Sequence, residues 1–231
     1  MPRSRWDILV EELKLLISQI GEVYNGPDQR AHRPERLRTA DDNPLLNAFL
    51  RWHDGPQGDD WTDRGAKLRN TLVTKTSWAV PSETALSRIL ECGPVVEVGA
   101  GTGYWAALLA NRGGNIIAYD IAPPGGSAIN RWHPEAHALP HVLSGGPDVL
   151  KAHPDRALFL CWPPQQSDMA EQCLAGYHGD TVIYVGEWKT STSASKRFFR
   201  ILDQEYERID VIDLPAWPSM RDRLYVFRRP S

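Results

Sequence analysis

The chain has 231 residues and carries 26 lysines and arginines against 29 aspartates and glutamates, which gives a formal net charge of −3. This length suits one α/β domain with an N-terminal extension. The slightly acidic balance argues against a polyanionic ligand such as nucleic acid, although a local basic face remains compatible with one.

The three cysteines, Cys92, Cys161 and Cys173, have neither C-x-x-C nor zinc-ligand spacing. They predict free thiols in a reducing compartment, with no disulfide and no structural metal. The N-terminus runs early into charged residues and no stretch of about 18 apolar residues occurs, so neither a signal peptide nor a membrane span is expected. We therefore expect a soluble, cytoplasmic protein.

The first part of the chain is predicted to be helical. Ser82 suits the N-cap position of one of the helices, and Gly93 suits its end. We expect residues 1–93 to form a helical cap and residues 94–231 a ligand-binding core. Apolar periodicity places the helices of the cap at residues 6–23, 44–53, about 60–74 and about 83–91.

The segment 24–43 is rich in proline, arginine and aspartate. Its arginines include Arg30, Arg33, Arg36 and Arg38. A run of this kind is typical of a solvated loop, and recognition of a phosphate or carboxylate is the alternative.

The most informative motif runs from Glu97 to Trp105 and reads Glu-Val-Gly-Ala-Gly-Thr-Gly-Tyr-Trp. A short apolar strand precedes it and an apolar helix follows. The three glycines allow positive φ and a close approach of a ligand, and we expect the free amides at the start of the helix to face that ligand. A dinucleotide fingerprint would have a glycine where Tyr104 stands, so the motif argues against a nicotinamide cofactor.

The order acid-x-Gly-x-Gly-x-Gly instead resembles the first motif of class I S-adenosylmethionine-dependent methyltransferases. In that family the acid reaches the aminoacyl end of the cofactor, and Glu97 matches it. A second strand, 115–120, ends in Asp120, which lies 21 residues beyond Gly99, where such a sheet places the acceptor for ribose hydroxyls. The resemblance covers about residues 75–228. It implies S-adenosyl-L-methionine as cofactor and a Rossmann-like sheet of seven mostly parallel strands with an antiparallel terminal hairpin.

The candidate cofactor-binding residues lie in the glycine turn, at the ends of the strands and before the first strand. The segment Ser77–Trp78 can close over the methionine end of the cofactor, and a core tryptophan beside a proline turn is the alternative. The full set is Ser77, Trp78, Glu97, Gly99, Ala100, Gly101, Gly103, Tyr104, Trp105, Asp120, Ile121, Ser144 and Cys161.

Residues 121–140 contain many prolines and glycines, so a regular helix is not expected there. His133, His137 and His141 recur at intervals of four, but the prolines between them break the helix that would align them as metal ligands. A third strand near 143–144 is expected to present Ser144 and Gly145 to the adenine.

A fourth strand, 157–161, is followed by Trp162-Pro163-Pro164-Gln165. The position resembles the Asp/Asn/Ser-Pro-Pro-Tyr/Phe loop of amino-methyltransferases, in which the polar residue and the aromatic ring hold a planar amino group. Both prolines match, while Trp162 and Gln165 depart from the pattern. We expect a rigid aromatic substrate loop, with Trp162, Pro163, Pro164, Gln165 and Trp188 as substrate-binding candidates.

The remaining chain alternates between helices and strands and ends in a predicted hairpin. Glu187 follows the fifth strand on the ligand side and is the first candidate for a general base, with His133 second. Trp162 completes the set of catalytic candidates. The elements are expected at 168–177, 181–185, 194–203, 208–214 and 223–228.

The function implied is methyl transfer to nitrogen or oxygen of a small molecule by in-line displacement. A nucleic-acid amino-methyltransferase is the first alternative, supported by the paired prolines and the arginine-rich segment and opposed by the net charge. The second is a repurposed fold that binds a partner or catalyses another displacement. A homodimer or a protein partner stays open.

Overall fold

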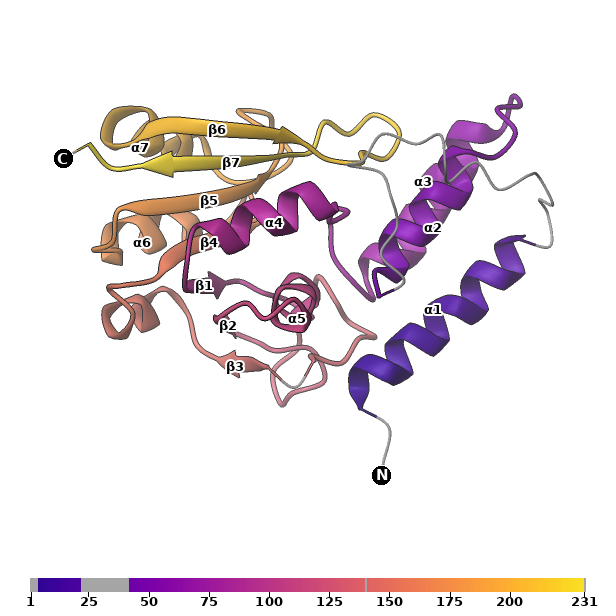
Figure 1. Ribbon diagram of the computed structural model, residues 1–231, viewed down its shortest axis with the longest axis horizontal. Helices are drawn as coiled ribbons and strands as arrows, with labels where there is room; N and C mark the ends of the chain where they lie inside the picture. Colours follow the sequence, from indigo (N-terminus) through magenta and orange to yellow (C-terminus); the bar gives the residue numbers. More distant parts are fainter. Residues whose placement is uncertain (1–3, 22–41, 140, 231) are drawn as a thin grey trace.

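The computed structural model describes residues 4–21, 42–139 and 141–230 (Figure 1). Its centre is a seven-stranded sheet of order β3-β2-β1-β4-β5-β7-β6, in which β7 runs antiparallel to both of its neighbours. This confirms the predicted α/β fold, including the terminal hairpin. The strands are β1 (Val95–Val98), β2 (Ile116–Asp120), β3 (Val142–Ser144), β4 (Ala157–Cys161), β5 (Thr181–Gly186), β6 (Glu207–Asp213) and β7 (Arg223–Arg228).

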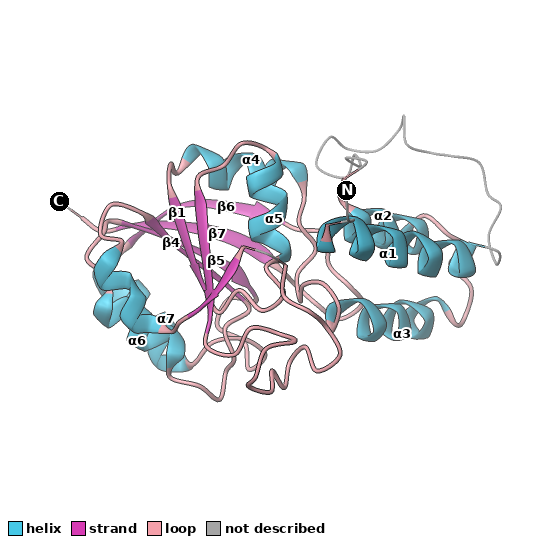
Figure 2. Ribbon diagram, turned by 90° about the horizontal axis from the view of Figure 1, so that it is seen from below, coloured by secondary structure: helices cyan, strands magenta, loops and turns pink. Residues whose placement is uncertain are grey.

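Helices cover both faces of the sheet. Helices α4 and α5 lie on one face, and α6 and α7 lie on the other (Figure 2). Three further helices precede the sheet in the chain. The bounds are α1 (Arg5–Gly21), α2 (Pro44–His53), α3 (Trp61–Val73), α4 (Glu83–Glu91), α5 (Tyr104–Asn111), α6 (Met169–Gly176) and α7 (Lys196–Glu205), with a 3-10 helix η3 (Pro147–Ala152).

The hydrophobic core has two parts, because the side chains of each strand point alternately to the two faces of the sheet. Val95 and Phe159 pack with α4 and α5, whereas Val96 and Leu158 pack with α6 and α7. Successive side chains of a strand point to opposite faces, so a strand buried on both faces is a continuous apolar run. This explains why β1 and β4 are short stretches with almost no polar residues.

The N-terminal helices join the same core. The Tyr104 hydroxyl, at the start of α5, accepts a hydrogen bond from the backbone N–H of Leu45 at 2.9 Å and donates to Asn43 Oδ1 at 3.1 Å. Phe49 and Trp52 of α2 share one hydrophobic cluster with the strands and with α4 and α5. The division at residue 93 stays a prediction, and Arg30, Arg33, Arg36 and Arg38 lie outside the described residues.

The local signals in the sequence were accurate for α4. Ser82 caps it, with its hydroxyl accepting from the N–H of Ala85 at 3.3 Å, and Gly93 beyond its end has a φ of +86°.

Among the described residues, no helix has the length and apolar character needed to cross a membrane.

Candidate functional site

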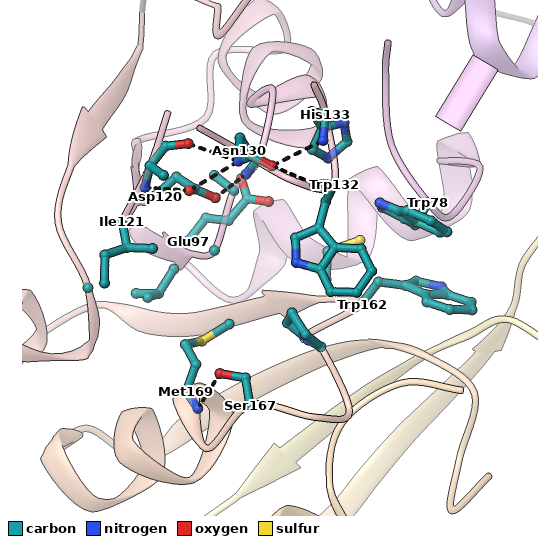
Figure 3. Close-up of a pocket in the computed structure, with 18 of the residues that line it drawn as sticks. Trp78, Glu97, Asp120, Ile121, Asn130, Trp132, His133, Trp162, Ser167 and Met169 are labelled. Carbon is teal, nitrogen blue, oxygen red and sulfur yellow. Dashed lines mark hydrogen bonds between the residues drawn. The ribbon is translucent and has the colours of Figure 1, made fainter. Parts of the chain in front are cut away.

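A cavity of about 680 Å³ lies at the carboxyl ends of β1, β2 and β4 (Figure 3). Asp120, Ile121 and Glu97 lie on one side of it, and Trp78 and Trp162 lie on the other. It brings together eleven of the predicted cofactor-binding residues. These are Ser77, Trp78, Glu97, Gly99, Ala100, Gly101, Tyr104, Trp105, Asp120, Ile121 and Cys161.

The glycine turn has the predicted backbone, and its own amides are hydrogen-bonded within the protein. Gly99, Gly101 and Gly103 have φ of +76°, +55° and +77°, a region that favours glycine. The N–H groups of Gly99 and Ala100 donate to the carbonyl of Tyr119 at 2.8 and 2.9 Å, and that of Gly101 donates to Asp120 Oδ2 at 2.8 Å. The protein itself therefore uses these three amides to fold the turn, and the expectation that amides at the start of α5 face a ligand stays a prediction.

Two side chains cover the glycines. A Cβ placed on Gly99 would lie 2.8 Å from Met169 Cε, and one placed on Gly101 would lie 2.6 Å from His133 Nε2. The turn is therefore packed tightly under Met169 and His133, both of which line the cavity. A larger residue at either glycine would have to displace them.

Glu97 closes β1 at the base of the cavity and is 1% exposed. Burial raises the pKa of its carboxyl to about 8, with a further contribution from the charge of Asp120. A backbone hydrogen bond from Ala106 acts in the opposite direction. Its Oε2 is buried and has no hydrogen-bond partner among the described residues. A buried acid with one unsatisfied oxygen is costly to the fold unless a ligand supplies the missing donor or positive charge.

Asp120 connects the glycine turn to the loop that follows β2. In addition to the Gly101 amide, its carboxylate accepts from the N–H of Ala122 at 2.9 Å and from Asn130 Nδ2 at 3.4 Å. Asn130 Oδ1 in turn accepts from the backbone N–H groups of Trp132 and His133, both at 3.0 Å. One carboxylate therefore organises both the turn and the loop.

Sequence reasoning did not assign Asn130, Trp132 or Met169 to the site, yet all three line the cavity. Asn130 carried a signal. An asparagine in a proline-rich loop favours a turn in which its side chain accepts from amides two and three residues later, as it does here. Trp132 and Met169 had no local signal, because only the fold brings them to the ends of β1 and β4.

His133, the second base candidate, lies inside the cavity lining. Its Nδ1 lies 3.0 Å from the carbonyl oxygen of Thr74. A carbonyl can only accept, so Nδ1 carries the hydrogen and Nε2 of the neutral ring has an available lone pair. Burial lowers the pKa of the imidazole below its ordinary value of 6.5, which keeps the ring neutral at neutral pH.

Glu187, the first base candidate, is absent from the described lining of the cavity. Its Oε2 accepts from the hydroxyls of Thr190 and Thr192 at 3.0 and 2.6 Å, and its Oε1 accepts from the N–H of Arg221 at 2.7 Å. Both oxygens therefore hold two surface loops together. Trp188 likewise packs away from the cavity, against Phe227 at a ring separation of 5.3 Å.

Of the remaining predicted site residues, some line the cavity and others lie outside its lining. Trp162, Pro164 and Gln165 line it, whereas Pro163, Gly103 and Ser144 do not. Gly103 is the N-cap of α5. The neighbours of Ser144, Gly145 and Gly146, reach the cavity in its place.

Trp162 lies at the end of β4 in an unusual conformation. Its φ is +49°, rare for a bulky residue, and its indole N–H donates to Asp222 Oδ1 at 2.8 Å. Asp222 is 2% exposed, and none of the residues that the structure describes forms a hydrogen bond with its Oδ2. Burial raises the pKa of this carboxyl to about 7. The indole of Trp162 is thus fixed in place by a buried acid.

No model of a known protein family matches the sequence, and no curated protein matches it. Among solved structures, magnesium protoporphyrin IX methyltransferase from Synechocystis PCC 6803 is 12% identical with a TM-score of 0.47, covering 89% of this chain and 99% of that one. A 1,6-didemethyltoxoflavin-N1-methyltransferase from Burkholderia thailandensis is 13% identical with a TM-score of 0.42, covering 81% and 87%. The N-methyltransferase NodS from Bradyrhizobium japonicum WM9 is also 13% identical, with a TM-score of 0.42, covering 64% and 94%.

These likenesses are distant, and the fold assignment stands on the sheet itself. Parallel strands in the order 3-2-1-4-5, followed by an antiparallel β7 inserted beside β5, make the Rossmann-like sheet of class I S-adenosylmethionine-dependent methyltransferases. The chain therefore has the methyltransferase fold, with its cavity at the ligand-binding end of the sheet.

Proposed function

We propose that the protein is an S-adenosylmethionine-dependent methyltransferase that acts on a small molecule. The observation that carries the proposal is the Oε2 of Glu97, which is buried at the base of the cavity and has no hydrogen-bond partner in the described part of the chain. The aminoacyl end of the cofactor carries an ammonium group, which would give this oxygen a donor and compensate the charge. Among the described residues that line the cavity, Glu97 is the acid that is both buried and left with an unsatisfied oxygen.

The remaining contacts fit the same cofactor. Asp120, which ends β2, has acceptor capacity for the ribose hydroxyls beyond the hydrogen bonds it already makes. Ile121 is 78% exposed and lines the cavity, as Met169 does from α6, so an adenine ring between them would bury both side chains. When bound, the sulfonium supplies a methyl group that a nucleophile takes by in-line displacement, with the S–C electron pair remaining on sulfur.

In this proposal the chain has three tasks, which are to bind the cofactor, to align the acceptor and to receive a proton. Nitrogen or oxygen acceptors lose a proton as the new bond forms. We assign its reception to His133 Nε2, because the ring is neutral, its Nδ1 is fixed on Thr74 and it lies in the cavity lining. Glu187 is assigned a structural role, because both of its oxygens are occupied.

Small-molecule acceptors are favoured over nucleic acid by the loop after β4. In the amino-methyltransferase pattern a polar side chain precedes the paired prolines and holds the amino group. Here Trp162 occupies that position, and its indole N–H is directed to Asp222 instead of to the cavity. The cavity volume of about 680 Å³ is also within the range of small-molecule sites.

The proposal is tested by isothermal titration of the full chain with S-adenosylhomocysteine. We expect the wild type to bind, and Asp120→Ala to bind more weakly by about 1–3 kcal/mol, the cost of losing a charge-assisted hydrogen bond. The same variant should be less stable to denaturant, because the Gly101 amide and Asn130 lose their acceptor. Asp148→Ala is the control, since Asp148 is exposed in η3 and does not line the cavity. Absence of binding by the wild type would contradict the proposal.

A second prediction concerns the protonation of His133. We expect its imidazole to be the Nδ1–H tautomer and to titrate below its ordinary pKa of 6.5, because burial disfavours the charged form. Long-range nitrogen–proton correlation spectra measure both properties. The exposed His137 provides the control. An Nε2–H tautomer, or a pKa above the ordinary value, would rule out the proposed proton acceptor.

A further inference from the structure

Three tryptophans from distant parts of the chain meet at one end of the cavity (Figure 3). Trp78 precedes α4, Trp132 lies in the loop after β2, and Trp162 directly follows β4. The rings of Trp78 and Trp162 stack with centroids 5.9 Å apart and an interplanar angle of 28°. Trp132 meets Trp78 edge-on, also at 5.9 Å, with an angle of 86°. We call these residues the indole cluster.

The cluster combines a fixed part with an accessible part. Trp162 is held by its hydrogen bond to Asp222, and Trp78 stacks on it. The backbone N–H of Trp132 donates to Asn130 Oδ1, and its side chain, in edge contact with Trp78, is 39% exposed. A large indole exposed beside two others at a cavity offers a flat apolar surface, which a planar ring can cover with more contact than a puckered one.

Two arginines lie over the rings of the cluster. The guanidinium carbon of Arg69 lies 5.2 Å from the ring centroid of Trp78 and 5.8 Å from that of Trp162. That of Arg131 lies 4.7 Å from the centroid of Trp132. Asp222, which accepts from the Trp162 indole, and Glu187 act on Arg69 through their charge.

These positions determine the charge that a ligand of the cluster can carry. The negative faces of aromatic rings attract cations, so three indoles alone would suit an amine. Here guanidinium groups already lie over all three rings, and a second cation in the same place would be repelled by them. Arg131 also lines the cavity and is exposed, so it can approach a negative substituent.

We propose, building on the proposed function, that the indole cluster is the acceptor site and that it selects a planar aromatic acceptor bearing no positive charge. The acceptor ring packs against the Trp132 face that Arg131 leaves uncovered, with Trp162 and Pro164 beneath it. Arg131 favours acceptors that carry an anionic group such as a carboxylate. Trp78, Trp162 and Arg69 form the rigid wall behind the site.

Three bicyclic probes of similar size test the proposal by calorimetric titration of the full chain, with and without S-adenosylhomocysteine. They are 2-naphthoate, decahydro-2-naphthoate and 2-naphthylmethylammonium. We expect 2-naphthoate to bind about fivefold more tightly than its saturated analogue, the gain that aromatic contact adds to apolar burial. The ammonium probe should bind more weakly than 2-naphthoate. Equal affinity for the planar and saturated anions, or preference for the ammonium probe, would overturn the proposal.

Two variants assign these preferences to residues. Trp132→Leu keeps an apolar side chain and should remove most of the preference for the planar anion, lowering its affinity about fivefold. Arg131→Gln should reduce the discrimination against the ammonium probe. The matched control is Arg208→Gln, because Arg208 lies over the ring of Trp188 at 5.8 Å, outside the cavity lining. Unchanged probe affinities in Trp132→Leu would place the ligand elsewhere and overturn the proposal.

The two proposals fail in distinguishable ways. If S-adenosylhomocysteine binds but the probes show no preference, the acceptor site is wrong and the methyltransferase assignment stands. If the cofactor product does not bind, both assignments fall, whatever the probes do. Melting temperatures of the variants verify that each is folded under the titration conditions.

Discussion

Replacing Glu97 with glutamine is expected to weaken the binding of S-adenosylmethionine about 10- to 100-fold near pH 8. The change keeps the size of the side chain and removes its charge. A hydrogen bond between charged groups contributes about 1.5–3 kcal/mol, and the neutral amide cannot replace it. Isothermal titration measures the loss directly.

The affinity of the wild type for S-adenosylmethionine should also depend on pH. With a pKa of about 8, Glu97 is largely protonated at neutral pH and must release its proton when an ammonium group binds beside it. Affinity should therefore rise by up to about tenfold per pH unit between pH 6 and 8. Above that it should fall, because the α-amino group of the ligand loses its own proton at about pH 7.7–8.0.

In Glu97→Gln the rising limb should disappear, while the fall at high pH remains. Titrations in buffers of different ionisation enthalpy count the proton released by the wild type and should find none released by the variant. Asp168→Asn is the control, because Asp168 also lines the cavity but is exposed. A rising limb that persists without Glu97 would show that another group releases the proton.

The second large effect is expected on stability. Trp162→Ala should lower the free energy of unfolding by about 2–4 kcal/mol, because it removes a stacked indole and deprives Asp222 of its hydrogen-bond donor. For a chain of this length that corresponds to a drop of very roughly 5–15 °C in melting temperature. Thermal unfolding followed by circular dichroism measures it.

The loss should be larger at pH 8 than at pH 6. The carboxyl of Asp222 has a pKa raised to about 7, so its charged form destabilises the fold as the pH rises through that value. Removing the indole N–H removes the main interaction that lowers this pKa, which increases the penalty. Combining Trp162→Ala with Asp222→Asn should recover part of the stability at pH 8. Equal melting temperatures for Trp162→Ala and the wild type would contradict the role assigned to this pair.

The sequence was sufficient for the parts of the fold that depend on neighbouring residues. Val95 and Val96 followed by Glu97 and three glycines predicted a buried strand and a turn, and β1 and the turn have that form. The strand ending in Asp120 and the terminal hairpin were likewise predicted and found. Each follows from short-range periodicity and glycine chemistry.

The site depends on contacts that are distant in the sequence, and there the predictions were incomplete. Glu187 has the sequence features of a base at a strand end, but Arg221 and two threonines occupy its oxygens. Trp132 enters the cavity from a loop without regular structure, and Arg69 reaches Trp162 from α3. No local pattern specifies which of these side chains meet once the chain is folded.

The covered glycine turn has an evolutionary consequence. Because Met169 and His133 fill the space above Gly99 and Gly101, and the backbone amides are used within the protein, folding alone is enough to keep these glycines. A descendant that abandoned the cofactor would retain the glycine signature and would gain stability by replacing its buried acid with a neutral residue. In proteins with this turn, the presence of the acid at position 97 is therefore a better marker of ligand binding than the glycines themselves.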